Sequence, residues 1–156
     1  MSSETIVTAL FLISAVIAAG VLISAIFPAI YRTADTFGSV SHEADTQMRT
    51  DVKIVNAYSN STQWATVWLK NIGTSRIGAA ELNDGDIFVG VPGNFERKSL
   101  QGTYVIEGNS NGFWDPGETL TIHVQSALLP STPGNVVYIS LVLPNGVKRS
   151  TEFTSG

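Results

Sequence analysis

The segment IVTALFLISAVIAAGVLISAIF occupies residues 6–27 and contains no charged side chain. As an α-helix, at about 1.5 Å per residue, it spans roughly 30 Å, which matches the hydrocarbon thickness of a lipid bilayer. A helix satisfies its backbone hydrogen bonds within one segment, so a single stretch of chain can cross that layer in this form. The sequence therefore predicts an N-terminal helix that lies either in a membrane or among the apolar helices of a filament core.

A secretory signal peptide and the buried helix of a soluble domain are the two other structures that such a segment can form. A signal peptide has a basic start and a shorter apolar run, whereas this chain begins MSSET, with one acid and no base. A buried helix needs other helices around it, and the rest of the sequence is rich in strand patterns. We therefore favour the membrane-spanning or filament-core helix.

Composition limits the classes of protein to which the chain can belong. It has 156 residues, a charged fraction of 14% and a net charge of −4, and it lacks cysteine. The length suits one anchor and one domain. The absence of a basic patch argues against a nucleic-acid partner, and the absence of cysteine excludes disulfides, thiolate metal sites and cysteine nucleophiles. We expect stability to come from the β-core, helped by an ion or by assembly.

A weaker apolar pattern follows Pro28 and extends the helix into a stalk. Its members recur at alternating spacings of four and three, as in a heptad repeat. Pro28 removes one intrahelical hydrogen bond and is expected to bend the helix. The stripe includes small side chains and Gly38 interrupts it, so the stalk either packs against a partner or is a solvated linker helix. The predicted oligomer interface consists of Ile30, Ala34, Phe37, Ala44 and Met48.

From residue 51 onward the pattern changes to the period of two that is typical of β-strands. The expected strands are 52–58, 64–69, 86–91, 102–108, 118–125, 136–143 and 147–153, the last two joined by a hairpin at residues 144–146. About seven short strands separated by turn residues predict an antiparallel, Ig-like β-sandwich with no helical layer. The predicted fold class is therefore α+β, with a transmembrane helix (about 5–30) and helical stalk in residues 1–50 and an extracytoplasmic sandwich in residues 51–156.

Trp64 and Trp68 share one face of the second expected strand. If Ala65, Val67 and Leu69 face the core, the two tryptophans form an apolar patch that a partner would cover. In the inverted register both tryptophans are core residues. We favour the inverted register because tryptophan is usually well buried, and we keep a partner interface at Trp64 and Trp68 as the alternative.

The segment EGNSNGFWDPGE at residues 107–118 has the spacing of a calcium loop, with Glu in place of the first Asp. Gly112 stands at the sixth position, where the loop needs a sharp turn. The same residue types also build an ordinary β-loop, so a weak calcium site and a plain turn both stay open. The candidate ligands are Glu107, Asn109, Asn111, the Phe113 carbonyl, Asp115 and Glu118.

Two further features bear on modification and catalysis. Asn60 opens the triplet Asn-Ser-Thr, an acceptor pattern for N-glycosylation in an exported domain. His42 and His123 lack a serine-and-acid arrangement nearby in sequence, and no phosphate-binding glycine loop occurs. We therefore expect a protein that is not an enzyme, with calcium as the one candidate cofactor.

Three segments are informative when taken together. The first is the N-terminal segment MSSETIVTALFLISAVIAAGVLISAIFPAIY, the second is VWLKNIGTSRI at Val67–Ile77, and the third is WDPGE at Trp114–Glu118. These segments resemble the archaellin-related FlaG/FlaF family of archaellum accessory proteins. The second is similar to the archaellin-type strand and turn V-x-V-K-N-x-G, and the third to the family's Pro-Gly-Glu turn. The resemblance covers both the helix and the sandwich, and its N-terminal part is the more specific.

The resemblance implies a motility role as a single-pass, stator-like subunit of the archaeal cytoplasmic membrane. Its β-domain would lie outside the cytoplasm, below the surface layer, although Arg32 and Arg49 after the span favour the opposite orientation. The implied partners are further copies of the chain, a FlaF-like protein, a surface-layer protein and membrane lipid. The start at Met1, without a basic glycine-ended leader, favours this accessory role over a filament-forming archaellin or pilin. An exported calcium-dependent binding module is a third hypothesis.

Overall fold

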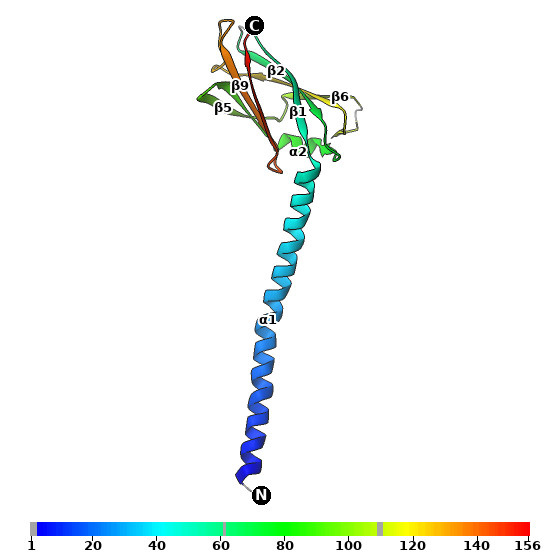
Figure 1. Ribbon diagram of the computed structural model, residues 1–156, viewed down its shortest axis with the longest axis vertical. Helices are drawn as coiled ribbons and strands as arrows, with labels where there is room; N and C mark the ends of the chain where they lie inside the picture. The colour runs from blue at the N-terminus through cyan, green and yellow to red at the C-terminus, as the bar shows by residue number, and fades with distance from the viewer. Residues whose placement is uncertain (1–2, 61, 109–110) are drawn as a thin grey trace. The chain divides into compact units, whose positions relative to one another are not determined.

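The computed structural model describes residues 3–60, 62–108 and 111–156. The chain forms two compact units, Met1–Glu43 and Ala44–Gly156. A long helix, α1 (Ser3–Arg49), makes up the described part of the first unit, and its last residues belong to the second unit together with all the β-strands (Figure 1).

Helix α1 passes Pro28 without interruption, and none of its 47 residues is buried. Several of its hydroxyl side chains bond within the helix: Thr8, Ser24 and Thr33 each donate to the carbonyl four residues earlier at 2.8 Å. Glu4 lies in the first turn, where a carboxylate complements the helix dipole. Within the described residues, α1 is the one helix that is long and apolar enough to cross a membrane.

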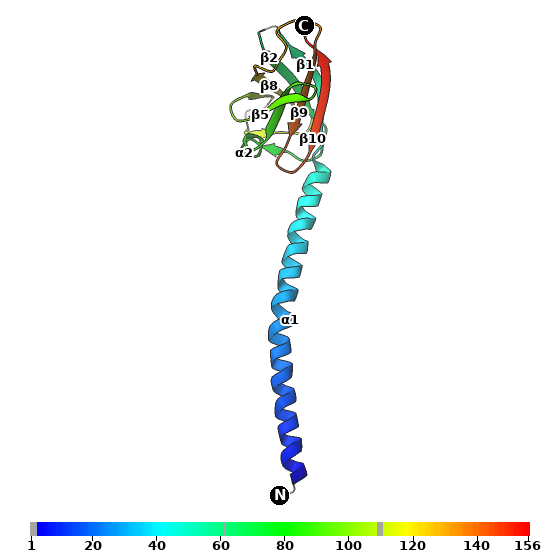
Figure 2. The same ribbon diagram turned by 90° about the vertical axis from the view of Figure 1, so that its left-hand side faces the viewer.

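The second unit is an antiparallel β-sandwich (Figure 2). One sheet has the order β1 (Val52–Ser59), β2 (Trp64–Asn71), β8 (Thr119–Gln125) and β6 (Tyr104–Glu107). The other has the order β10 (Lys148–Thr154), β9 (Val136–Val142), β4 (Asp86–Val91) and β5 (Asn94–Ser99). This arrangement confirms the predicted fold class, a long apolar helix followed by antiparallel sheets.

Both sheets contribute to a single hydrophobic core. Leu69 and Ile122 from one sheet and Ile87 and Ile139 from the other are each at most 1% exposed. Trp114, in the short strand β7 (Phe113–Trp114), is completely buried in the same core. Strand β7 pairs with β3 (Ile77–Gly78), so a segment outside the two main sheets also contributes to the core.

The register of β2 is the opposite of the one that we favoured from the sequence. Ala65, Val67 and Leu69 are at most 1% exposed, whereas Trp64 is 44% exposed. Strand β2 pairs with β8 so that Val67 lies opposite Ile122 and Leu69 opposite Leu120, and these side chains fill the core together. The expectation that the tryptophans are core residues is therefore wrong.

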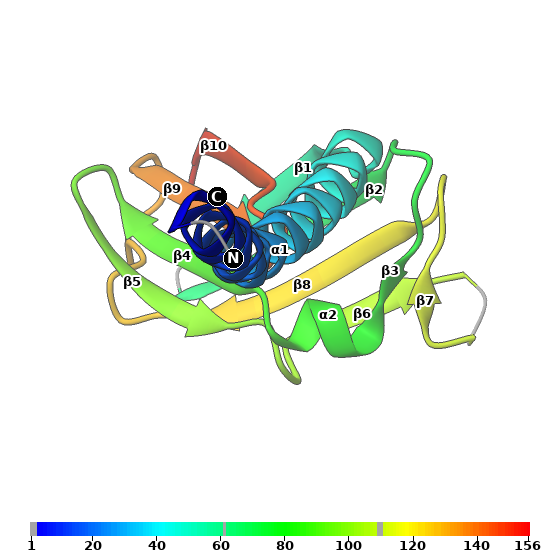
Figure 3. The same cartoon turned by 90° about the horizontal axis from the view of Figure 1, so that it is seen from below.

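The sequence patterns did not predict four elements: the short strands β3 and β7, helix α2 (Ala79–Asn83) and strand β5. Helix α2 is a single short turn that follows β3 and lies beside β6 (Figure 3). It is held there because the Tyr104 hydroxyl donates to the Ala79 carbonyl at 3.1 Å and to Asn83 Oδ1 at 3.0 Å. Strand β5 contains the charged run Glu96, Arg97 and Lys98, which suits an exposed sheet edge because charges discourage pairing with another chain.

Candidate functional site

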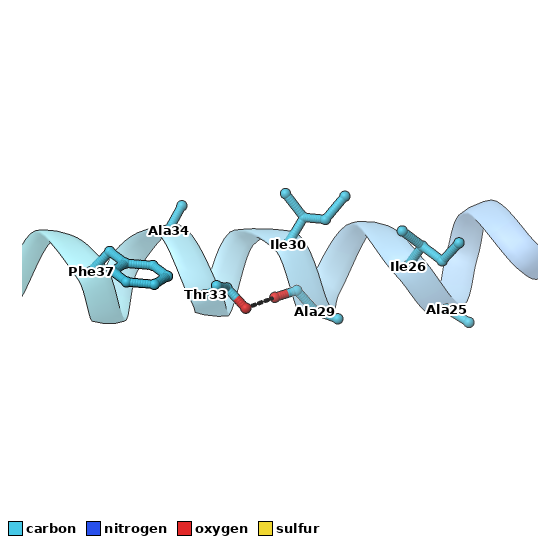
Figure 4. A pocket seen from close by; sticks show the side chains of 7 residues that line it. All are labelled: Ala25, Ile26, Ala29, Ile30, Thr33, Ala34 and Phe37. Atoms are coloured by element: carbon cyan, nitrogen blue, oxygen red, sulfur yellow. Dashed lines mark hydrogen bonds between the residues drawn. The ribbon is translucent and has the colours of Figure 1, made fainter.

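The predicted oligomer interface lies on an exposed apolar face of α1. Ile30 is 56% exposed, Phe37 is 68% exposed, and Met48 on the last turns is 87% exposed. Ile26, Ile30 and Ala34 project from the same side of the helix (Figure 4). A shallow groove on this part of α1 is lined by Ala25, Ile26, Ala29, Ile30, Thr33, Ala34 and Phe37.

Small side chains make this face suitable for helix packing. Ala25, Ala29 and Ala34 leave hollows between the larger residues, and small residues of this kind allow two helix backbones to approach closely. Thr33 adds no unpaired polar group, because its hydroxyl donates to the Ala29 carbonyl (Figure 4). The face is therefore one that either lipid or another apolar helix can cover.

The two β-domain segments that resemble archaellin motifs contact each other directly. Asn71 is completely buried, and its side-chain amide donates to the carbonyls of Ser75 at 2.9 Å and Trp114 at 3.0 Å. Its backbone bonds to the same turn, accepting from Gly117 at 2.7 Å and donating to the Glu118 carbonyl at 3.1 Å. Asn71 thus joins the K-N-x-G turn to the Pro-Gly-Glu turn.

The acidic side chains of the loop with calcium spacing accept hydrogen bonds from within the loop and from β8. Glu107 accepts from the Thr121 hydroxyl at 3.2 Å, and Asp115 accepts from the Asn111 amide at 2.7 Å. Glu118 Oε2 accepts from the Asp115 backbone amide at 2.9 Å. Asn109 lies outside the described residues.

These contacts explain the loop as a turn without requiring an ion. Gly112 has φ = 78°, which suits the sharp turn that its position demands. The Phe113 backbone amide donates to Asn111 Oδ1 at 2.9 Å. No group of three or more His, Asp or Glu side chains gathers anywhere in the part of the chain that the structure describes. Calcium binding stays a prediction.

Trp64 and Trp68 lie on the outer face of the β1-β2-β8-β6 sheet. Between them, Thr66 pairs with His123 across the strands, and the Thr66 hydroxyl lies 3.1 Å from His123 Nδ1. Tyr58 on β1 adds a third aromatic ring, 49% exposed, to this tryptophan face. The face combines exposed aromatic surface with hydrogen-bonding groups, as protein interfaces do.

A second aromatic cluster, which the sequence analysis missed, lies on the other sheet. The Phe95 ring centroid is 6.0 Å from that of Phe88 and 5.2 Å from that of Tyr138. Gly90 lies opposite both Phe95 and Tyr138 in the sheet, and a Cβ there would come within 2.4 Å of the Asn94 carbonyl. The period-two pattern of 86–91 could have indicated Phe88, but β5 itself was not expected.

Asn60, the candidate glycosylation residue, directly follows β1. Asn60 Oδ1 accepts from the backbone amides of Thr62 at 3.1 Å and Trp64 at 3.0 Å, and from the Thr62 hydroxyl at 2.9 Å. Ser61, the middle residue of the triplet, lies outside the described residues. Glycosylation of Asn60 stays a prediction.

Solved structures of archaellum components resemble this chain. The archaellum periplasmic stator protein FlaG from Sulfolobus acidocaldarius has a TM-score of 0.53 and 21% identity, covering 67% of this chain and 99% of that one. The archaeal flagellum of Methanospirillum hungatei strain JF1 has a TM-score of 0.69 and 16% identity, covering 100% of this chain and 94% of that one. At these identities the matches show a shared fold.

Sequence comparison gives the family directly. A protein of Archaeoglobus fulgidus, named only as uncharacterized, is 29% identical over 163 residues and covers 99% of both chains. The family model for archaeal-type flagellin matches residues 2–153, which include both the apolar helix and the sandwich. The chain is therefore an archaellum-related structural protein and a member of the archaeal-type flagellin family.

Proposed function

We propose that this chain is a stator-like subunit of the archaeal motility machinery, anchored by α1 in the cytoplasmic membrane with its β-sandwich outside the cytoplasm. The observation that carries the proposal is the uncharged segment 6–27, which forms continuous helix with no buried residue. Such a helix needs an apolar environment, and a bilayer supplies one without any partner. The likeness of the sandwich to the FlaG stator protein supports the same role.

The partners that we propose are further copies of the chain and a FlaF-like protein. A solved structure described as the archaellum periplasmic stator protein complex FlaF and FlaG has a TM-score of 0.53 to this chain. The tryptophan face is the surface that we assign to the FlaF-like partner. Exposed aromatic side chains of this kind are enriched at the centres of protein interfaces. A surface-layer protein is a further proposed partner.

Copurification tests the assignment of the tryptophan face. The full chain with Trp64→Ala and Trp68→Ala should lose a FlaF-like protein that the unmodified chain retains, because both indole rings leave the proposed interface. Phe95→Ala, which removes an exposed ring from the other sheet, is the matched control and should retain the partner. Retention by the double variant, or loss by the control alone, would assign the partner to another surface.

A filament-forming archaellin is the second candidate function, and one observation favours it. The alignment to the Methanospirillum hungatei flagellum covers the whole chain, helix included, whereas the alignment to FlaG covers two thirds of it. In this role the groove on α1 would be covered by neighbouring helices of the same filament instead of lipid. Membrane extraction separates the two roles: an anchored subunit stays in the membrane pellet after alkaline washing and leaves it only with detergent.

A further inference from the structure

The last turn of α1 is capped by a loop from a different part of the β-domain. The Arg49 carbonyl accepts hydrogen bonds from the backbone amides of Thr74 at 2.9 Å and Ser75 at 3.2 Å. The amides of Ile72 and Gly73 both donate to the Asp51 carbonyl at 2.9 Å. The final carbonyls of a helix have no partner within the helix, so the 72–75 loop supplies the cap that α1 lacks.

Gly73 allows this close approach. A Cβ on Gly73 would lie 2.5 Å from the Arg49 carbonyl oxygen and 2.5 Å from the Asp51 amide nitrogen, and both of these are backbone atoms that cannot turn aside. Asn71 also holds the loop in place, because its buried side chain accepts from the Gly73 amide at 3.0 Å and donates to the Ser75 carbonyl. Any side chain at position 73 would therefore push the loop away from the helix end.

The hairpin after β9 holds the same helix end from another direction. Thr50 is 4% exposed, and its hydroxyl donates to the Thr46 carbonyl at 2.8 Å and accepts from the Asn145 amide at 3.0 Å. Arg149 on β10 donates to the Val52 carbonyl at 2.9 Å and forms an ion pair with Asp51. The end of the helix and the first residues after it are thus bonded to two segments that are distant in sequence.

We propose that these contacts form a helix socket, made by Asn71, Gly73, Thr74, Ser75 and Asn145, that fixes the last turn of α1 to the sandwich. Force carried by that turn then passes into the sandwich without a hinge at the helix–strand boundary. A hinge at residues 49–51 would break at least five hydrogen bonds together, in partly buried surroundings where unpaired polar groups are costly. The inference goes beyond the proposed function, because the socket serves a stator subunit and a filament subunit equally.

Distance measurement between two spin labels tests the socket within residues 44–156. The chain has no cysteine, so Met48→Cys on the exposed last turns of α1 and Glu152→Cys on the exposed side of β10 take one label each. In the full chain in detergent, with labelled chains diluted in unlabelled ones so that distances between copies are not observed, we expect one narrow distance distribution. With Gly73→Ala the distribution should become broad, while circular dichroism shows that the strands persist.

Gly78→Ala is the matched control for the steric change. A Cβ on Gly78 meets only the Phe113 ring, at 3.8 Å, which is an ordinary contact. This variant should keep the narrow distribution. A broad distribution in the unmodified chain, or a narrow one in folded Gly73→Ala, would overturn the proposal.

A second variant covers the case in which Gly73→Ala does not fold. Asn145→Ala removes the contact with Thr50 without creating a clash. Hydrogen exchange of the Thr50 amide, which donates to the Thr46 carbonyl, should then accelerate roughly 3- to 10-fold, the effect of losing about one hydrogen bond. The Ile139 amide in the core strand β9 should exchange at an unchanged rate. Unchanged exchange at Thr50 would contradict the socket.

Discussion

Asn71 joins two turns of the second unit through its buried side chain. Its buried side chain forms three hydrogen bonds to the backbone, with Ser75, Trp114 and Gly73. Asn71→Ala leaves one buried carbonyl, one partly buried carbonyl and one amide without these partners, so we expect the free energy of unfolding to fall by about 3 kcal/mol. Urea denaturation of the full chain in detergent, followed by tryptophan fluorescence, measures the loss.

Asn94→Ala provides the control for this prediction. Asn94 is exposed at the start of β5, and surface substitutions of this kind change stability by about 0.5 kcal/mol or less. A loss below about 1 kcal/mol in Asn71→Ala would mean that the surrounding backbone groups find other partners, and that Asn71 does not hold the two turns together.

The stability of the β-domain is expected to depend on pH through the Glu96 carboxyl group. A hydrogen bond from Ser126 lowers the pKa of the Glu96 carboxyl below its usual value, and Lys98 adds to the effect with Nζ 3.2 Å away. A carboxyl with a lowered pKa in the folded state stabilises the fold above its unfolded pKa of about 4.3, and this stabilisation is lost as pH falls through the folded value.

Glu96→Gln tests that sign by thermal melting at several pH values. Because the glutamine cannot ionise, the melting temperature of the unmodified chain should exceed that of the variant at neutral pH, and the difference should shrink below pH about 4. This difference in melting temperature should be small, because solvent screens the interactions of an exposed carboxylate. A difference that is the same at every pH would show that the lowered pKa plays no part.

At the residue scale the sequence identified the right segments but could not assign their roles. The segments around Asn71 and Trp114–Glu118 stood out as family-like turns, but which atoms they bond depends on β2 and β8 lying side by side. Similarly, β2 reads WATVWLKN, with apolar side chains on both faces, so its alternation alone could not decide which face is buried. The pairing with β8 decides it.

At the scale of elements, the exposed apolar face of α1 predicts that copies of the chain associate through it. Phe37 lines the groove and is 68% exposed. Phe37→Asp should reduce the oligomer of the full chain in detergent to a smaller species, because a carboxylate in an apolar helix interface is costly. Light scattering after size exclusion gives the mass of the protein in the micelle.

Ser39→Asp places the same charge away from the groove and is the control. Successive residues in a helix are about 100° apart, so position 39 faces away from position 37. This variant should keep the parent oligomer. If Phe37→Asp also keeps it, the stripe from Ile30 to Met48 is not an interface between copies.

The spacing of the 107–118 loop predicts calcium binding, which thermal melting can test. A ligand that binds only the folded state raises its melting temperature, so calcium at about 1 mM should raise it relative to chelator if the loop binds the ion in the range of extracellular sites. Glu118→Ala should abolish the rise. It should also lower stability without calcium, since Glu118 accepts from the Asp115 amide. Equal melting temperatures with calcium and with chelator would show that the loop does not bind the ion.

The elements that the sequence could and could not predict differ for physical reasons. Strand β4 coincides with its predicted range, because apolar side chains alternate through DIFVGV and face the core. Strand β5 was not predicted because charged residues interrupt its apolar alternation. Its inward positions include Glu96 and Lys98, which form an ion pair at the open edge of the sheet. Helix α2 is too short for a 3.6-residue period to appear.

At the scale of the whole molecule, the fold alone does not separate an anchor from a filament subunit. The same long apolar helix suits lipid and a bundle of neighbouring helices equally, because both surround it with apolar groups. Solved structures of both kinds share this fold at TM-scores of 0.53 and 0.69. The distinction depends on what covers α1 in the cell.

The most direct test is therefore to find where the protein resides. Filaments are sheared from cells that make the chain, membranes are prepared from the same cells, and the chain is quantified in both fractions by mass spectrometry. The proposed anchored, stator-like subunit should be found in the membrane fraction and be absent from the sheared filaments. Recovery of the chain as a main component of the filaments would contradict the account and make it a filament subunit.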